Sequence, residues 1–190
     1  AREAIDDLKE IIGFDGDTKA GLLGFNEAVE TYGTEVVLAS DGTGSAKTFI
    51  SKDGDKIVRD MNSLVTAILD VTNGRETPDT MLLPIEQYSI IANTRMPGDA
   101  NFTVLKWFLN NNPYIKEVKM YYKMKEAGVG SVDRMIVYKK DPSKVNYEIP
   151  LILETLPGQQ TALISEYNLH SRVAGIIMKR PLSTAYADGI

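Results

Sequence analysis

The clearest pattern of apolar positions lies between Asp53 and Asn73. Apolar side chains recur there at steps of three and four residues, with charged residues between them: Ile57, Met61, Leu64, Val65, Ile68 and Leu69. This spacing places the apolar side chains on one face of an α-helix. The sequence therefore predicts an amphipathic helix that ends at Gly74, because glycine is common just past helix ends.

A short apolar segment and two further helices follow this pattern. Met81–Leu83 predicts a buried strand, and Pro84 suits the first position of a helix that runs to Asn93. Its apolar side is expected to contain Ile85, Tyr88, Ile91 and Ala92. After a loop with Pro97 and Gly98, we expect a helix over residues 103–110 with Val104, Trp107 and Phe108 on its buried face. Trp107 is predicted to anchor the core.

The N-terminal region is less regular. Helical spacing of Ile5, Leu8, Ile11 and Ile12 predicts a helix over residues 1–12 that Gly13 stops. Because the sequence starts without Met and is helical from the outset, we expect a longer chain to precede Ala1. Residues 13–33 are expected to be mostly irregular, and Glu35–Ala39 to form a short strand before a turn-rich loop.

Beyond Pro113 the pattern changes from helical to strand-like. Five runs predict strands: Ile115–Tyr122, Arg134–Tyr138, Tyr147–Leu153, Ala162–Ser171 and Val173–Met178. Helices followed by a series of strands indicate an α+β fold with a mixed or antiparallel sheet, because a purely parallel sheet needs a crossover between successive strands.

Composition narrows the possible functions. The chain has 190 residues, 43% of them hydrophobic, which is enough for a sizeable core. No apolar run approaches the roughly 20 residues of a membrane span, so neither membrane insertion nor secretion is expected. The chain has no cysteine, which excludes disulfides and thiolate metal sites. A net charge of −5 argues against a general grip on nucleic-acid phosphates.

One loop has a composition similar to a nucleotide-binding loop. Residues 40–48 read S-D-G-T-G-S-A-K-T, so Lys47 and Thr48 sit where a phosphate loop has its Lys and Thr. That loop needs Gly before the Lys, whereas Ala46 is there, and Asp41 occupies the leading Gly position. An acidic side chain opposes phosphate, so a surface loop before a helix is the favoured interpretation.

His170 is the only histidine, and it lies in a strand-like run beside Arg172. Without a serine motif or a cysteine, an ordinary hydrogen-bonded strand histidine is favoured over a catalytic base. The carboxylate pairs Asp6–Asp7 and Asp53–Asp55 are explained by solvation and helix-start electrostatics. No catalytic, cofactor-binding or metal-binding residue is therefore assigned.

The segment Pro113–Gly128 mixes lysines with Tyr114, Tyr121 and Tyr122, as single-stranded nucleic-acid sites do. The favoured alternative is a strand with Val118 and Met120 on one face and lysines on the exposed face, where they discourage edge-to-edge pairing.

Several segments, in order along nearly the whole chain, resemble the major capsid protein family of tailed phages and prophages. They are A-G-L-L-G-F-N at 20–26, P-D-T-M-L-L-P at 78–84, Q-Y-S-I-I-A at 87–92, V-L-K-W-F-L-N-N-N-P-Y at 104–114, D-R-M-I-V-Y-K-K-D-P at 133–142, E-I-P at 148–150 and R-P-L-S-T-A-Y-A-D-G-I at 180–190. The resemblance implies the Hong Kong phage-type capsid fold, with a peripheral lobe, an axial lobe and a spine helix.

On this resemblance, residues 1–23 are the end of the spine helix and a glycine-rich connection, 24–131 are mainly the axial lobe, and 132–190 are strands that complete both lobes. The N-terminal arm and extended loop of such proteins have no counterpart in the sequence. The implied partners are copies of the chain in pentamers and hexamers, a scaffold, portal or protease during assembly, and packaged DNA without sequence-specific binding. No cofactor and no membrane are implied, and the implied location is the virion capsid, after assembly in the host cytoplasm.

Two alternatives remain open. A cellular nanocompartment shell would share the fold but enclose protein cargo. A nucleotide-binding enzyme would use the Lys47 loop, or a cleft lined by His170.

Overall fold

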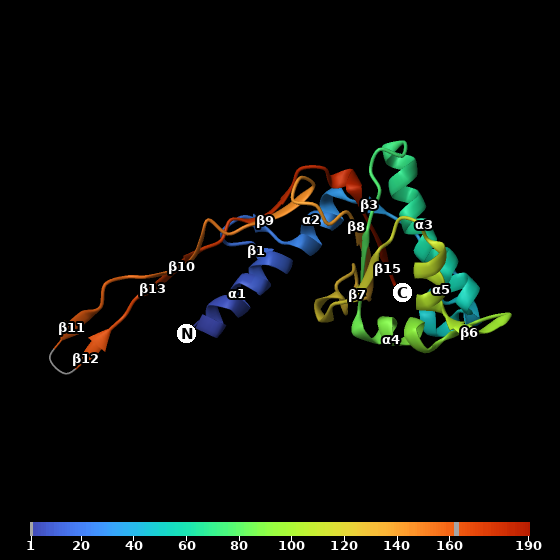
Figure 1. The fold of residues 1–190 in the computed structure, drawn as a ribbon, viewed down its shortest axis with the longest axis horizontal. Helices are drawn as coiled ribbons and strands as arrows, with labels where there is room; N and C mark the ends of the chain where they lie inside the picture. Colours follow the sequence, from blue (N-terminus) through green and yellow to red (C-terminus); the bar gives the residue numbers. More distant parts are fainter. Residues whose placement is uncertain (1, 162–163) are drawn as a thin grey trace.

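The computed structural model describes residues 2–161 and 164–190. The helices are α1 (Arg2–Phe14), α2 (Phe25–Tyr32), α3 (Gly54–Thr72), α4 (Ile85–Asn93) and α5 (Val104–Asn111), with short 3-10 turns η1 (Thr43–Ser45), η2 (Phe49–Ser51), η3 (Tyr122–Met124) and η4 (Pro181–Ser183). Figure 1 shows an elongated molecule, with a compact part around α3–α5 at one end and a long β-ribbon at the other.

A mixed five-stranded sheet forms the centre of the compact part. Its strands, in spatial order, are β3 (Thr34–Glu35), β15 (Thr184–Asp188), β8 (Arg134–Tyr138), β4 (Thr80–Leu83) and β7 (Glu117–Met120). The two outer pairs are parallel and the two inner pairs are antiparallel. The α+β fold with a mixed sheet is therefore confirmed.

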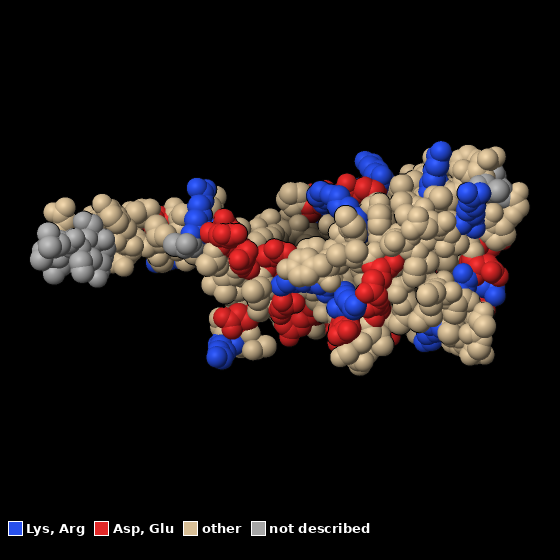
Figure 2. All heavy atoms as spheres, turned by 90° about the horizontal axis from the view of Figure 1, so that it is seen from below, with Lys and Arg blue, Asp and Glu red and all other residues tan. Residues whose placement is uncertain are grey.

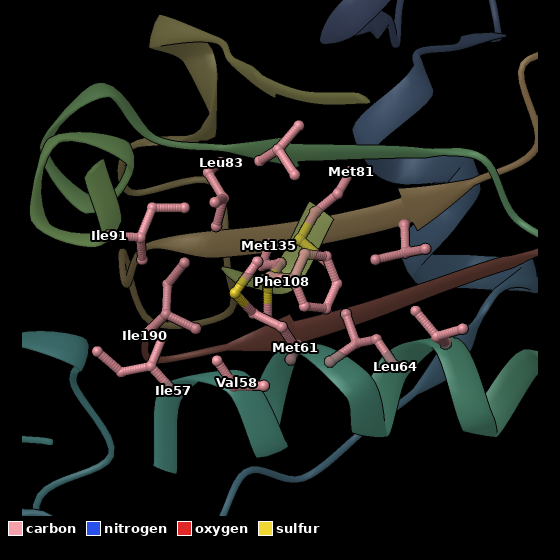
Figure 3. Close-up of a cluster of buried hydrophobic side chains, with 14 of the residues drawn as sticks. Ile57, Val58, Met61, Leu64, Met81, Leu83, Ile91, Phe108, Met135 and Ile190 are labelled. Carbon is pink, nitrogen blue, oxygen red and sulfur yellow. The ribbon is translucent and has the colours of Figure 1, made fainter. Parts of the chain in front are cut away.

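Alternating residues of the sheet face two separate cores, as the two-residue period of a strand requires. On one face, Met81, Met135 and Ala185 pack against α3, α4 and α5. Figure 3 shows this core, with Met61 and Leu64 of α3 directed at Met135 and Phe108, and Ile57 next to Ile190. On the other face, Leu82, Ile136 and Tyr186 lie in one row across adjacent strands and join Phe14, Phe25 and Val29 in the second core.

The strongest sequence patterns are confirmed. Asp53 is the N-cap of α3, and Asn73 closes the helix in the left-handed conformation before Gly74, which also has a positive φ. The strands β4 and β8 lie where the sequence predicts them. Pro84 is the N-cap of α4 rather than its first residue, so the helix begins one residue later than expected, and Ile85 is exposed rather than on the buried side.

Several expectations were wrong. Of the expected strand Glu35–Ala39, only Glu35 lies in a strand, β3. The helix α1 continues through Gly13 to Phe14. The region expected to be irregular contains a hairpin of β1 (Gly16–Asp17) and β2 (Leu22–Leu23), then α2. The loop with Pro97 and Gly98 joins two strands, β5 (Arg95–Met96) and β6 (Asp99–Thr103), which pair with each other. Trp107 is only partly buried, and Phe108 is the aromatic side chain fully enclosed by the core.

Paired strands between β8 and β15 form the ribbon. The antiparallel pairs are β9 (Val145–Glu148) with β14 (Gly175–Met178), β10 (Leu151–Thr155) with β13 (Leu169–Arg172), and β11 (Gln159–Thr161) with β12 (Ile164–Glu166). The expected single strand Tyr147–Leu153 is thus two strands separated at Pro150. The expected strand Ala162–Ser171 includes residues 162–163, which lie outside the described residues; its remainder forms β12 and β13.

Candidate assembly surfaces

The second face of the sheet is incompletely covered, and the open part is an apolar groove of about 530 Å³. Leu82 of β4 and Tyr138 of β8 line it from the sheet. Further apolar lining comes from α1, α2, the end of β7 and the ribbon, and includes Phe14, Phe25, Met120, Tyr121, Val145, Tyr147 and Ile176. Several separate parts of the chain therefore build one apolar surface that is open to solvent.

Edge-to-face contacts position the aromatic rings of the groove. The ring centroids of Phe14 and Tyr121 lie 5.1 Å apart, and those of Phe25 and Tyr138 lie 5.3 Å apart, both at 66° between planes. This arrangement is favourable for the quadrupoles of aromatic rings. Burial, reinforced by a 3.0 Å hydrogen bond from the Tyr121 hydroxyl to Glu10 Oε1, raises the pKa of Tyr121, so the phenol stays protonated.

Tyr147 explains why α1 contains a glycine near its end. A Cβ atom at Gly13 would lie 3.2 Å from the Tyr147 ring, so glycine lets this ring pack tightly on the helix. The Tyr147 hydroxyl also donates a 2.6 Å hydrogen bond to the Lys9 carbonyl oxygen. The wall of the groove is thereby fixed to α1.

Two lysines, Lys119 and Lys140, line the groove. Lys119 Nζ lies 3.1 Å and Lys140 Nζ 3.5 Å from the same atom, Glu117 Oε1. Asp141 is also part of the lining, and its carboxylate accepts a 2.8 Å hydrogen bond from the Ser143 backbone. Because an ammonium group has three N–H donors, both lysines retain donors for a second carboxylate.

The outer ribbon, which we call the arm, comprises β10, β11, β12 and β13. Its large exposed apolar side chains are Ile152, Leu156, Tyr167 and Leu169, with Ile152 and Tyr167 each 68% exposed. The Tyr167 ring packs closely on Gly158, where a Cβ atom would come within 2.7 Å of it. An isolated two-stranded ribbon is marginally stable in water, so the arm gains stability when another surface covers it.

The helix α1 also exposes apolar side chains. Leu8 and Ile11, which lie with Ile5 and Ile12 on the face that the helical spacing defines, are about half exposed. Part of that face lines a smaller pocket with Leu169, Ser171 and Val173 next to the arm.

Arg134 holds α2 against the sheet. Its guanidinium is fully buried and donates to Asp188 Oδ1 and Oδ2, to Glu30 Oε2 and to Asn26 Oδ1, at 2.7 to 2.9 Å. It also lies 4.6 Å from the centroid of the Tyr186 ring. Hydrogen bonds to these carboxylates raise the pKa of Arg134 against the opposing effect of burial, so the cation persists.

The Lys47 loop is a packed surface loop that precedes α3. Its Asp41 pairs with Arg59 at 2.8 Å and approaches Lys52, which is buried in an ion pair with Asp60. The hydrogen bond from Arg59 lowers the pKa of Asp41. Gly42 packs on Ser51, where a Cβ atom would lie 2.2 Å from the hydroxyl oxygen. The polar groups of this loop are therefore engaged with neighbouring side chains, and their arrangement gives no support for a phosphate-binding site.

The other candidate residues lie apart from one another. His170 is on β13, opposite Glu154, and accepts a 3.4 Å hydrogen bond from Arg172 Nε. Asp6 pairs with Lys9 on α1, whereas Asp53 and Asp55 are at the start of α3. In the described part of the chain, no group of three or more His, Asp or Glu residues is placed to hold a metal ion.

The segment Pro113–Gly128 is only partly as expected. Val118 is buried, but Met120, expected on the same face, is 60% exposed beside the groove. Lys123 pairs with Asp15 at 2.7 Å and Lys125 with Glu86 at 2.6 Å. Figure 2 shows basic and acidic side chains mixed on the face seen from below. Within residues 2–161 and 164–190, no helix is both long and apolar enough to cross a membrane.

Sequence reasoning missed the groove. Its aromatic side chains come from two distant parts of the sequence, Phe14 and Phe25 from one and Tyr121, Tyr138 and Tyr147 from the other, so no local pattern marks them as one surface. The exception is α2, where Phe25, Ala28, Val29 and Tyr32 follow helical spacing and could have revealed the helix that contributes Phe25.

The solved structures that this chain resembles include a phage capsid and a virus-like particle. Over all of this chain and 62% of the other, it matches "The capsid of Myoviridae Phage XM1" with a TM-score of 0.79 and 18% identity. A virus-like particle from Pyrococcus furiosus matches 97% of the chain and 63% of its own, with a TM-score of 0.54 and 12% identity. A structure from Mycobacterium phage Che8 matches 97% of the chain and 58% of its own, with a TM-score of 0.54 and 16% identity.

At these identities the matches establish the fold, which is that of phage capsid subunits. The profile of the major capsid protein family matches residues 1–190, so the chain belongs to the major capsid protein family. No curated protein sequence matches it. The chain spans less than two thirds of the length of each of these three structures.

Proposed function

We propose that this chain forms the wall of an icosahedral phage or prophage shell, in which copies of it meet as pentamers and hexamers. The family match over all 190 residues is the observation that carries the proposal. Exposed apolar surface on the arm, on α1 and in the groove supports it, because unpaired apolar surface is typical of sites that contact other protein molecules.

We assign the compact part of the molecule to the axial lobe, and α1 with the ribbon to the peripheral lobe. This division follows the ranges 1–23, 24–131 and 132–190. Two features support it. The range 24–131 contains three strands of the sheet with α3, α4 and α5, and 132–190 contributes β8 and β15 to that sheet before and after the ribbon.

The cargo we propose is DNA, held without sequence-specific contacts. The net charge of −5 and the internal pairing of lysines in Pro113–Gly128 support a wall that encloses DNA rather than one that grips it. Scaffold, portal and protease belong to the same proposal as assembly partners, with assembly in the host cytoplasm and the virion capsid as the final location. The role is structural, without catalysis.

A cellular nanocompartment is the second candidate. The likeness to the virus-like particle from Pyrococcus furiosus supports it, although its TM-score of 0.54 is well below the 0.79 of the phage capsid. The nucleic-acid content of purified particles separates the two, because a phage shell would contain DNA and a nanocompartment would contain protein cargo.

Electron microscopy tests the proposal directly. The product of the complete gene and this 190-residue chain would be imaged in negative stain, and their masses measured by light scattering. Closed shells, or rings of five and six subunits, from the complete product are expected. Small discrete oligomers from both proteins would contradict the proposal.

A further inference from the structure

We propose that the arm of one copy docks in the apolar groove of a second copy, next to β7. This inference rests on the proposed self-assembly and specifies which two surfaces meet. In this docking, Glu154 of the arm contacts the two lysines of the groove, and Ile152 and Leu156 contact the apolar lining of the groove.

The groove has the shape and chemistry for an extended segment. It runs beside β7, which is the last strand at its end of the sheet and pairs with β4 on one side. The backbone groups on the outer side of such a strand are available to a further strand. Exposed Met120 and the ring of Tyr121 line the groove along β7, so a strand added there would also cover apolar surface.

The arm has the complementary properties. Along β10 and the residue after it, Ile152, Glu154 and Leu156 are all exposed, which gives two apolar side chains around one carboxylate. In the described chain β10 pairs with β13, so its other edge is open. An exposed, partly apolar strand edge of this kind is a template for pairing with another strand.

Charge makes the match specific. Lys119 and Lys140 share Glu117 and retain N–H donors, which a carboxylate in the groove would accept. Glu154 is the charged residue between exposed Ile152 of β10 and exposed Leu156, which follows β10. Electrostatic complementarity of this kind fixes the register of an interface.

The occupant must belong to another molecule. In Figure 1 the arm runs away from the compact part, and β11 and β12 lie far from the sheet. The groove lies where the ribbon begins, at Val145 and Ile176. The arm therefore cannot fold back into its own groove without breaking the ribbon.

Disulfide trapping tests this docking, and the absence of native cysteine leaves a clean background. One preparation has Met120→Cys in the groove, and the second has Ile152→Cys or Leu156→Cys in the arm. After mixing and mild oxidation, a covalent dimer is expected for at least one arm position, because a disulfide needs Cα atoms within about 7 Å. Val71→Cys, an exposed apolar position on α3, replaces the groove cysteine in the matched control.

A charge exchange supplies the second measurement. Glu154→Lys on the arm copy is expected to lower the yield of trapped dimer about tenfold, and Lys140→Glu on the groove copy to restore it. Equal trapping by Met120→Cys and Val71→Cys would overturn the docking proposal. If light scattering shows assemblies that give no arm-to-groove dimer, the docking proposal fails and the proposed shell function stands. If the complete product and the 190-residue chain both stay monomeric at every concentration, both proposals are contradicted.

Discussion

Arg134 and Asp188 face each other across adjacent strands and share two hydrogen bonds, of 2.7 and 2.8 Å. Both guanidinium and carboxylate are planar, so this two-point contact fixes their orientation. Through Glu30 and Asn26 the same guanidinium reaches α2. One buried side chain of β8 thus connects β15 to α2, the helix that contributes Phe25 to the groove.

Removal of the Asp188 carboxylate is expected to lower the stability of the fold strongly. Asp188→Ala leaves the buried Arg134 cation without its main partner, and loss of one member of a buried pair costs about 3 to 5 kcal/mol. Glu30→Ala should cost about 1 kcal/mol or less, because the Glu30 carboxylate is 42% exposed and solvent screens the pair. Urea unfolding followed by circular dichroism measures both, and equal losses would show that Arg134 does not depend on Asp188.

Acid is expected to weaken the contact between α3 and the ribbon. Glu76 follows α3 and accepts 2.6 Å hydrogen bonds from Lys144 Nζ and Arg180 Nη1; the bond from Lys144 is the main cause that lowers its pKa below the ordinary 4.5. A carboxylate with a lower pKa in the folded state stabilises the fold above its unfolded pKa, and this stabilisation is lost as the pH falls through the folded value.

Glu76→Gln should therefore flatten the fall in the free energy of unfolding between about pH 5 and pH 3. The measurement is a series of urea titrations across this range. Glu3→Gln, at an exposed position of α1, is the matched control and should leave the slope unchanged. If the free energy of unfolding falls with the same slope in both variants, Glu76 does not contribute to the loss of stability in acid.

The two adjacent aromatic residues of α5 should differ in their effect on stability. Phe108 is 1% exposed and lies in the main core, so Phe108→Ala is expected to cost about 3 to 5 kcal/mol. Trp107→Ala should cost less, because part of the Trp107 side chain remains in contact with water in the folded protein. Thermal unfolding of the two variants gives the comparison, and a larger loss at Trp107 would restore it as the core anchor.

The hairpin between α1 and α2 contains a matched pair of glycines. A Cβ atom at Gly24 would lie 2.3 Å from the Phe14 carbonyl oxygen and the Gly16 nitrogen, so Gly24→Ala must displace backbone. Gly21 has open space around it and a φ of +68°, so Gly21→Ala adds only conformational strain, about 1 to 2 kcal/mol. We expect a much lower melting temperature for Gly24→Ala, and similar values for both variants would contradict the close packing.

The accuracy of the sequence-based predictions depended on how local each pattern is. The helix α3 was predictable because its six apolar side chains recur at helical spacing from Ile57 to Leu69, and β8 because Met135, Ile136 and Val137 are consecutive apolar residues. The strand β15 was not predicted. Its T-A-Y-A-D sequence is short and rich in alanine, and only pairing with β3 and β8 makes it a strand.

The candidate surfaces were less predictable for the same reason. The rings of Phe14 and Tyr138 meet only because α1 and β8 are brought together by the fold. The exposure of Leu8 and Ile11 could not be read from α1, since helical spacing identifies an apolar face without saying what covers it. The domain ranges stay a prediction.

The position of β15 determines when this protein can fold. It is the last strand of the sequence, yet it lies between β3 and β8 in the sheet. During synthesis β3 has no neighbour in the sheet until residues 184–188 leave the ribosome, and a pairing of residues 34 and 185 is among the most distant in the chain. A nascent chain therefore exposes both faces of an unfinished sheet, and its surfaces become competent to meet another copy only after β15 has been translated.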